Sequence, residues 1–177
     1  ALKIDMDASG AVRDYRRICN YETGEITVRW SDERGAWKRQ AFVSRDADVA
    51  VFELQAPSAG KLNCAISLQM PAEMNFPKGL KTKCLHTKDY LNIRVNYAAP
   101  MDTIGYEGGI RVKQKGGSSF LRNDTLYIKD ASEILLLSRT QKYPENCEAE
   151  WSKGFLKKEL DAIRANYNGL LLSLIHI

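Results

Sequence analysis

Residues that could perform acid–base or nucleophilic chemistry are few in this sequence, and they are scattered. Glu22 and Glu25 flank a predicted turn, and Asp46 and Asp48 lie in a predicted connection between strands. Carboxylates in such loops are usually solvated. His86 is the only histidine outside the last six residues, and no serine or cysteine can be placed beside it. We therefore predict no catalytic residue in this chain and an exposed loop position for His86.

The four cysteines do not form a metal-binding pattern. None of Cys19, Cys64, Cys84 and Cys147 belongs to a Cys-x-x-Cys pair, so we expect no zinc site, and nothing else in the sequence indicates a metal or a cofactor. Cys64 occupies an apolar position of an alternating segment, which predicts a small buried residue. The even number permits disulfides without requiring them.

Several aromatic side chains could stack on sugar rings. These candidates are Tyr15, Tyr21, Trp30, Trp37 and Tyr106. Trp30 shares an alternating apolar face with Ile26 and Val28, which favours a core position. Trp37 begins the return strand of a predicted hairpin, so we expect it at the surface, in contact with substrate or with another domain.

Arg16 and Arg17 are the other candidate contact residues. They are adjacent in a predicted strand, so their side chains point to opposite faces of a sheet. We expect them to pair with carboxylates within the sheet or at an interface with another domain.

Composition places the chain among globular proteins of one domain with a sizeable core. It has 177 residues, 44% of them hydrophobic and 27% charged, with a formal net charge of +4. The Lys78 to Lys83 basic cluster is broken by apolar residues, which favours a solvated face over a nucleic-acid interface. No apolar run is long enough to cross a bilayer, so we expect no membrane partner. Ala1 precedes a strand almost at once, and we interpret it as a cut end.

Apolar and polar residues alternate through most of the chain, which is typical of half-buried strands. Leu2 to Met6 and Leu91 to Tyr97 alternate strictly, whereas Val49 to Leu54 is nearly continuous apolar sequence and predicts a central strand. We count about eleven short strands separated by turns, with Gly108-Gly109 and Gly116-Gly117 as bulge or turn glycines. This pattern predicts a mainly β protein, an antiparallel β-sandwich over residues 1–143.

The period changes after Tyr143-Pro144. Apolar residues then recur at helical spacing, and we expect Trp151 and Phe155 to extend their stripe by one turn. The main positions of the stripe are Leu156, Leu160, Ile163, Tyr167 and Leu170. We predict a C-terminal α-helix from about Glu148 to Ala165, within a helical linker over residues 144–171 that leaves the sandwich and docks on its flank or on a following domain.

The last six residues, Leu172 to Ile177 (LSLIHI), match the translation of a transposon-type sequencing adaptor. We expect residues 172–177 to be an assembly artefact, and we assign no chemistry to His176.

An ordered set of residues resembles one family of carbohydrate-active enzymes. It begins with Leu2-Lys3-Ile4-Asp5, continues through the segment from Tyr15-Arg16-Arg17 to Leu54, and resumes from Gly108 to Thr140. In this order the residues resemble the N-terminal β domain of glycoside hydrolase family 95, the α-L-fucosidase family. Cys19 and Asn20 stand where that family usually has Leu and Asp, and the segment from Pro71 to Lys88 follows no family pattern.

The resemblance implies a super-sandwich of the galactose-mutarotase type and a parent enzyme that inverts the configuration of the sugar. Inversion needs a general acid and a base-activated water on opposite faces of the sugar. In the family these groups lie in an (α/α)6 barrel that follows the sandwich, so the chain alone is expected to be inactive. The implied partners are that barrel and fucosylated glycans, and the implied location is bacterial, secreted or periplasmic.

Two other functions remain open from the sequence. A free-standing carbohydrate-binding sandwich would present a row of exposed aromatic side chains on one sheet face. An adhesion or structural module would present neither those side chains nor a sugar site. The predicted linker helix favours the glycoside hydrolase domain, because a binding module does not need it.

Overall fold

The structure is a computed structural model that describes residues 1–6, 9–58, 61–70 and 75–172. In this part of the chain there are twelve strands and three helices. The strands are β1 (Leu2–Met6), β2 (Arg13–Asn20), β3 (Glu25–Asp32), β4 (Gly35–Ser44), β5 (Val49–Gln55), β6 (Leu62–Leu68), β7 (Lys81–Cys84), β8 (Tyr90–Asn96), β9 (Gly105–Lys115), β10 (Ser118–Arg122), β11 (Thr125–Ala131) and β12 (Glu133–Tyr143). The helices are α1 (Cys147–Lys153), α2 (Phe155–Ala162) and α3 (Tyr167–Leu172).

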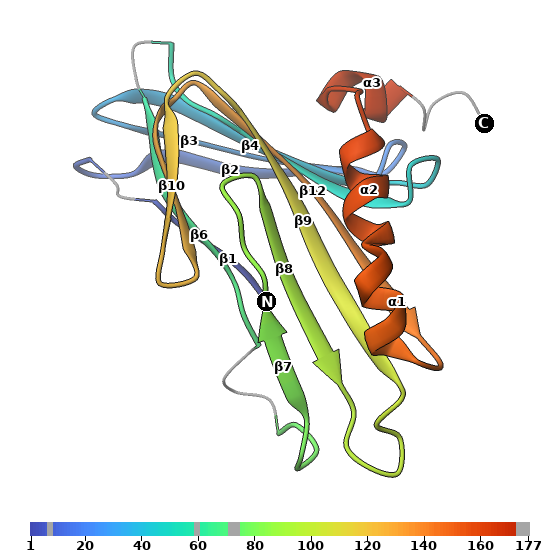
Figure 1. Cartoon of the computed structure of the whole chain (residues 1–177). Coiled ribbons are helices and arrows are strands. Elements are labelled where there is room, and N and C mark those ends of the chain that lie inside the picture. Colours follow the sequence, from blue (N-terminus) through green and yellow to red (C-terminus); the bar gives the residue numbers. More distant parts are fainter. Residues whose placement is uncertain (7–8, 59–60, 71–74, 173–177) are drawn as a thin grey trace.

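Two antiparallel sheets form the predicted sandwich (Figure 1). The small sheet has the order β1-β6-β11-β10, and the large sheet has the order β2-β3-β4-β5-β12-β9-β8-β7. The central position expected for Val49 to Leu54 is confirmed, because β5 lies between β4 and β12. The fold class is therefore the mainly β sandwich that the alternation predicts.

The last strand is much longer than its apolar run indicates. The sequence predicts a buried strand at Ile134 to Leu137, but β12 continues to Tyr143 and pairs with β9 throughout, ending at the Tyr143–Gly105 pair. Beyond Leu137 the strand carries polar side chains on both faces, so hydrophobicity alone does not mark its end.

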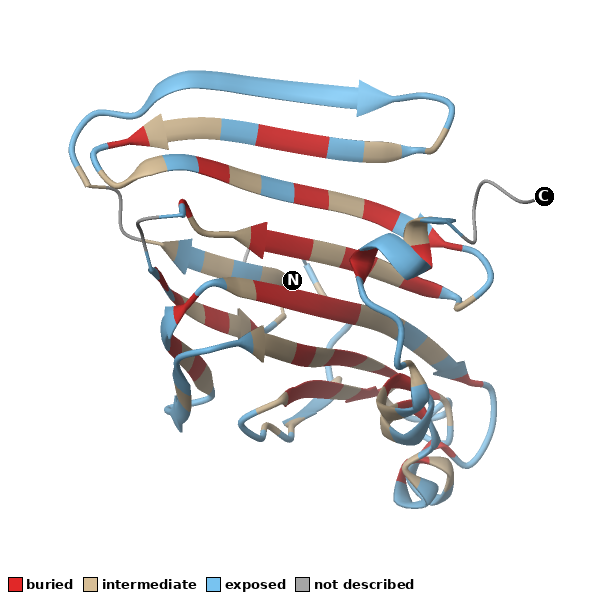
Figure 2. Cartoon of the chain, turned by 90° about the horizontal axis from the view of Figure 1, so that it is seen from above, coloured by how far each residue is buried: buried red, intermediate tan, exposed pale blue. Residues whose placement is uncertain are grey.

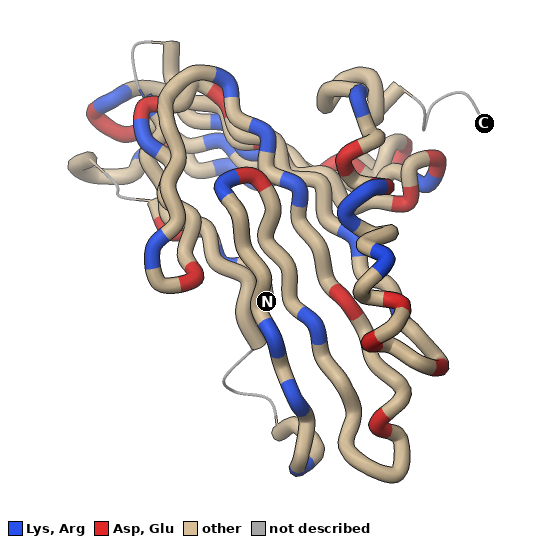
Figure 3. The backbone as a smooth tube through the Cα atoms, viewed as in Figure 1, with Lys and Arg blue, Asp and Glu red and all other residues tan. Residues whose placement is uncertain are grey.

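The main core lies between the two sheets. Buried side chains from the inner faces, such as Ile66, Leu126 and Leu136, are fully excluded from solvent. At one edge of the large sheet, β2 projects beyond this core, and all eight of its residues are exposed. Figure 2 shows this edge strand pale blue along its whole length, next to strands that alternate between buried and exposed positions. Figure 3 shows basic and acidic positions interspersed over the visible elements.

A second apolar cluster joins the helices to the outer face of the large sheet. Leu156 and Leu160 of α2 and Leu170 of α3 pack there against Val51 and Leu137 of the sheet. The predicted docking of the helical segment on the flank of the sandwich is thus observed within this chain (Figure 1). The helices have seven, eight and six residues, and among the described residues none could span a bilayer.

The single helix predicted from Glu148 to Ala165 is wrong in its continuity. Gly154 adopts a left-handed backbone conformation with φ of 62° and ends α1, and α2 ends where Ile163 becomes extended. The break shifts the phase of the apolar stripe. Trp151 is buried, as the predicted stripe requires. Phe155 follows the break and is 48% exposed, so it does not belong to the stripe. Of the suspected adaptor residues, Leu172 ends α3, and residues 173–177 lie outside the described part.

Gly109 lies inside a regular strand and not at the bulge that the sequence predicts. The pairing of β9 with β12 runs without a register shift through this position. A Cβ atom on Gly109 would lie 2.6 Å from the Tyr90 hydroxyl and 3.0 Å from Leu156. The glycine therefore lets α2 approach the sheet closely.

All four cysteines are free thiols with different exposure. Cys19 is exposed on β2, whereas Cys64 and Cys147 are buried, and burial raises the pKa of the Cys64 thiol to about 12. We expect an aromatic disulfide reagent to modify Cys19 quickly in the native chain and the buried pair only after unfolding, because the thiolate is the reactive form. Thiol titration in buffer and in denaturant measures this. A Cys19→Ser variant should lose the fast phase, and fewer than four thiols in denaturant would contradict the prediction.

Candidate functional site: the helix-covered face of the large sheet

A buried polar network lies beneath α1 on the outer face of the large sheet. Alternation along β8 directs Asn92 and Arg94 to this face, and the strand register sets Arg94 opposite Glu107 of β9. The Glu107 carboxylate accepts hydrogen bonds from Asn92 Nδ2 at 2.8 Å, Arg94 Nε at 3.0 Å and the Tyr143 hydroxyl at 3.2 Å. Burial and the nearby carboxylate raise the pKa of Tyr143. With three donors on one carboxylate, the network is a structural anchor.

The same network attaches the end of α1 to the sheet. Arg94 Nη2 donates to the carbonyl of Trp151 at 2.9 Å, and its guanidinium lies 5.6 Å from the centre of the Trp151 ring. A cation at the C-terminal end of a helix interacts favourably with the unpaired carbonyls there. Asn96 Nδ2 also donates to the Cys147 sulfur in the first turn of α1, at 3.0 Å. Both ends of this short helix are therefore held by β8.

Ion pairs hold α2 along the next two strands. Arg111 of β9 pairs with Asp161 at 3.1 Å, and Arg139 of β12 pairs with Glu159 at 3.1 Å. Lys113 donates to the carbonyl of Ile163, just after the helix, at 2.7 Å. These polar contacts flank the buried side chains of Leu156 and Leu160. Together the polar and apolar contacts fix the position of α2 on the sheet.

Tyr167 attaches α3 to strands β3 and β4, on the same outer face of the large sheet. Its hydroxyl donates to Glu25 Oε2 at 2.9 Å, and its ring meets the Phe42 ring edge-on with centres 5.0 Å apart. Glu25 and Tyr167 are 142 residues apart in sequence. The helical segment therefore crosses the sheet from β8 to β3 and is fastened at both extremes.

We expect a Tyr167→Phe substitution to lower the free energy of unfolding by about 1 kcal/mol, because it removes one hydrogen bond to a carboxylate and keeps the ring. Urea unfolding measures the change. Tyr21 is 94% exposed, and Tyr21→Phe is the matched control that should leave stability unchanged. Equal effects of the two substitutions would show that the contact to Glu25 does not stabilise the chain.

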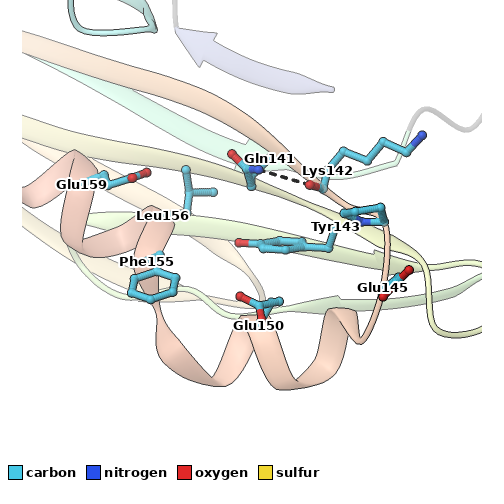
Figure 4. A pocket seen from close by; sticks show the side chains of 9 residues that line it. Gln141, Lys142, Tyr143, Glu145, Glu150, Phe155, Leu156 and Glu159 are labelled. Atoms are coloured by element: carbon cyan, nitrogen blue, oxygen red, sulfur yellow. Dashed lines mark hydrogen bonds between the residues drawn. The ribbon is translucent and has the colours of Figure 1, made fainter.

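A groove of about 410 Å³ opens between the α1–α2 corner and the end of β12. Figure 4 shows Phe155, Glu150 and Glu159 on the helical side, with Gln141, Lys142 and Tyr143 opposite. Glu150 already pairs with Lys153 at 2.6 Å and Glu159 with Arg139 at 3.1 Å. These carboxylates are committed to ion pairs, and among the described residues no cluster could hold a metal ion. The groove lies at the surface, at the junction of the helices and the end of β12.

The surface position expected for Trp37 is wrong, whereas the core position expected for Trp30 is confirmed, because Trp30 packs against the main core. Trp37 is 2% exposed in the main core, whereas Trp30 is only half-buried. The two face each other across β3 and β4 and stack with ring centres 5.9 Å apart. The Arg34 guanidinium covers the Trp37 ring at 4.6 Å. Arg34 also bonds Asp32, and this contact holds the pKa of that buried carboxyl well below its usual range. A hairpin end closed in this way cannot present Trp37 to a partner.

Arg16 and Arg17 are exposed on β2, but the structure does not bring them together. Arg16 is registered with Arg29 and Arg17 with Val28, so they lie on opposite faces of the sheet. Arg17 and Arg39 line a cleft of about 380 Å³ between β1 and the open edge of the large sheet. Neither Arg16 nor Arg17 forms an ion pair with another described residue. Their expected contact with another domain stays a prediction.

The exposed position expected for His86 is wrong. The ring is half-buried, Nδ1 accepts the backbone N–H of Asn92 at 3.1 Å, and burial lowers the pKa of the imidazole. His86 therefore fixes the turn before β8.

The sequence did not indicate the residues that fasten the helices. Asn92, Arg94 and Asn96 alternate with Leu91, Ile93 and Val95, a pattern that reads as one solvated face. Only the helices that cover this face turn it into an anchor.

Fold and site together define a class: an antiparallel β-sandwich domain with a helical segment packed on its large sheet. The chain belongs to the family described as "Glycosyl hydrolase family 65, N-terminal domain", whose model matches residues 1–144. The expected N-terminal domain of a glycoside hydrolase is therefore confirmed, but the family matched is 65, and the more specific assignment to the family 95 fucosidases is not supported by it.

A solved structure has the same fold. It is described as "Putative kojibiose phosphorylase from human microbiome", with a TM-score of 0.65 and 9% sequence identity over 98% of this chain. The chain covers only 26% of that protein, about a quarter of its length. A search of the curated proteins gave no match.

Proposed function

We propose that this chain is the scaffold domain of a larger glycoside hydrolase or glycoside phosphorylase, in which it positions a following catalytic domain and does not itself react with the sugar. The observation that carries the proposal is the fastening of the helical segment, from the Arg94–Trp151 contact to the Tyr167–Glu25 contact. A segment held at both ends leaves the sandwich in a fixed direction. The domain can therefore orient whatever follows α3.

We retain terminal α-L-fucosyl linkages as the first substrate to test, with hydrolysis by inversion in an (α/α)6 barrel. The ordered residues from Leu2 to Leu54 support this choice through their resemblance to the family 95 pattern. The likeness to a protein described as a kojibiose phosphorylase supports phosphorolysis of an α-glucoside as the second substrate class to test. A bacterial secreted or periplasmic protein fits either substrate.

The uninterrupted gene tests the scaffold role. We expect about 500 residues of helical repeats after Leu171, the size of an α/α barrel in one chain. A native stop codon directly after Ile177 would overturn the proposal.

The complete protein then distinguishes the substrates. It should release fucose from a chromogenic α-L-fucoside in the first case, with the β-anomer formed first by proton NMR, as inversion requires. In the second case it should consume kojibiose only when inorganic phosphate is present. The 177-residue chain alone should do neither, and turnover by it would show that the reaction centre lies in the sandwich.

A further inference from the structure

The outer face of the small sheet, turned away from the core, carries an ordered row of side chains. Strand register sets Phe120 of β10 opposite Tyr127 of β11, Tyr127 opposite Ala65 of β6, and Ala65 opposite Asp5 of β1. The neighbouring row, on the same face, has Thr125, Ser67 and Lys3 in the corresponding positions. Two aromatic rings at one end of a row, small residues in the middle and charged groups at the other end leave a hollow between walls.

The two aromatic rings stack on each other and leave one face free. Phe120 and Tyr127 are nearly parallel, with an interplanar angle of 11° and ring centres 5.1 Å apart. The rings stack across neighbouring strands, and in the register Ala65 of β6 lies on the other side of Tyr127 from Phe120. Lys129 lies 5.6 Å from the centre of the Phe120 ring, so Phe120 is backed by other groups.

A hollow of about 460 Å³ lies beside that free face. Its lining includes Tyr127, Ala65, Ser67, Thr125, Lys3 and Asp5 of the outer face, together with Leu68, Gln69, Cys84, Asn123 and Asp124, and it does not include Phe120. Lys3 and Asp5 form an exposed ion pair at 3.0 Å on the far wall. From β11 to β1 the distance is two strand spacings, roughly 10 Å. A flat ring between the walls makes one van der Waals contact of about 4 Å with Tyr127 and another with the Lys3–Asp5 wall. These two contacts take up most of the width, so the hollow has room for one such ring.

We propose that this hollow is a carbohydrate-binding site that takes a single pyranose ring. A pyranose has an apolar C–H face, which Tyr127 can cover, and hydroxyl groups around its edge, which need both donors and acceptors. Asp5 accepts, Lys3 donates, and the Ser67 and Thr125 hydroxyls do both. One aromatic platform surrounded by polar side chains suits a ligand with one apolar face and a polar edge.

The site is separate from the helix-covered face, because the small and large sheets present opposite outer surfaces of the sandwich. It would let the domain hold a glycan independently of any reaction centre. Only the choice of sugars as probes rests on the proposed function.

Chemical-shift titration of the 177-residue chain with L-fucose, D-galactose and D-glucose tests the proposal. We expect at least one sugar to shift amide signals of β1, β6 and β11 saturably, with a Kd on the order of 1–10 mM, the range of a weak single-ring contact. Tyr127→Ala should raise that Kd at least about tenfold. Phe120→Ala is the matched control: it breaks the same aromatic stack but leaves the hollow, so it should change the Kd less than about threefold.

Three results would overturn the site: no saturable shift with any of the three sugars, shifts confined to other strands, or equal weakening by the two alanine substitutions. Equal weakening would mean that the aromatic pair only stabilises the β10–β11 hairpin. None of these results bears on the scaffold role, which is tested by the gene and by turnover of the complete protein.

Discussion

Replacing Glu107 with alanine is expected to lower the free energy of unfolding by about 3–5 kcal/mol, the usual effect of removing one partner from a buried charged pair. Glu107 is 2% exposed and receives Asn92, Arg94 and Tyr143 on its two oxygens. Without the carboxylate, the guanidinium of Arg94, whose side chain is 18% exposed, would keep only the carbonyl and the ring of Trp151 as partners. The penalty is therefore the unpaired charge and not the lost contacts alone.

Urea unfolding and amide hydrogen exchange measure this effect. Exchange in α1 should accelerate more than exchange in the small sheet, because Arg94 holds α1 through Trp151. Glu107→Gln keeps an acceptor for Asn92 and should cost less than the alanine variant. Glu148, exposed in the first turn of α1, provides the surface control Glu148→Ala. A loss below about 1 kcal/mol for Glu107→Ala would contradict the anchoring role of the network.

Replacing Glu53 with glutamine is expected to stabilise the chain at about pH 8 by roughly 2–3 kcal/mol and to have little effect at about pH 4. Glu53 is 5% exposed on the outer face of β5, and its carboxyl accepts the Gln55 amide at 2.8 Å. Burial, followed by repulsion from Glu133, raises its pKa from 4.5 to about 7. Lys38 acts in the opposite direction, while Glu25 adds to the rise.

The sign of the pH dependence follows from proton binding. Between about pH 4.5 and 7 the folded chain keeps the Glu53 proton while the unfolded chain has released it. The unfolded state then binds fewer protons, so the free energy of unfolding falls as the pH rises through this window. A neutral amide of the same shape removes that dependence.

Urea unfolding of the wild-type and Glu53→Gln chains between about pH 4 and pH 8 gives the comparison. Glu133→Gln serves as the intermediate variant, because it removes the repulsion and leaves the burial, and it should recover only part of the gain. If the wild-type and Glu53→Gln stabilities stayed parallel from acid to alkaline pH, the carboxyl would be ionised in the folded chain and the prediction would fail.

The sequence predicts the burial of one face of each strand but not that of the other face. Alternation located β1 and β8 and the sandwich class, because burial of one face leaves a period of two in the residues, and a continuous apolar run located the central strand β5. It could not show that the polar face of β8 is also buried. Asn92 is 1% exposed under helices that begin more than 50 residues later, and no local pattern contains that information.

The two tryptophans show the same limit in a single cross-strand pair. Both Trp30 and Trp37 lie on the inner side of the large sheet and pair across β3 and β4, although the sequence predicted a core position for Trp30 alone. Trp37 is the more deeply buried of the two, and the Arg34 guanidinium at the hairpin end covers its ring. The predicted helix is likewise interrupted at Gly154, which is left-handed, and at Ile163, which is extended, and the spacing of apolar residues does not predict either backbone conformation.

By itself, then, the sequence determined the strands, the class of fold and the membership in a group of glycoside hydrolase domains, because these follow from period, composition and ordered residues. The tertiary structure alone decided the sites. The Glu107 network, the Tyr167–Glu25 contact across 142 residues and the hollow beside Tyr127 each need residues from strands or helices that are remote in the chain. Their chemistry depends on which polar face becomes covered and which stays open, and packing between distant elements sets that outcome.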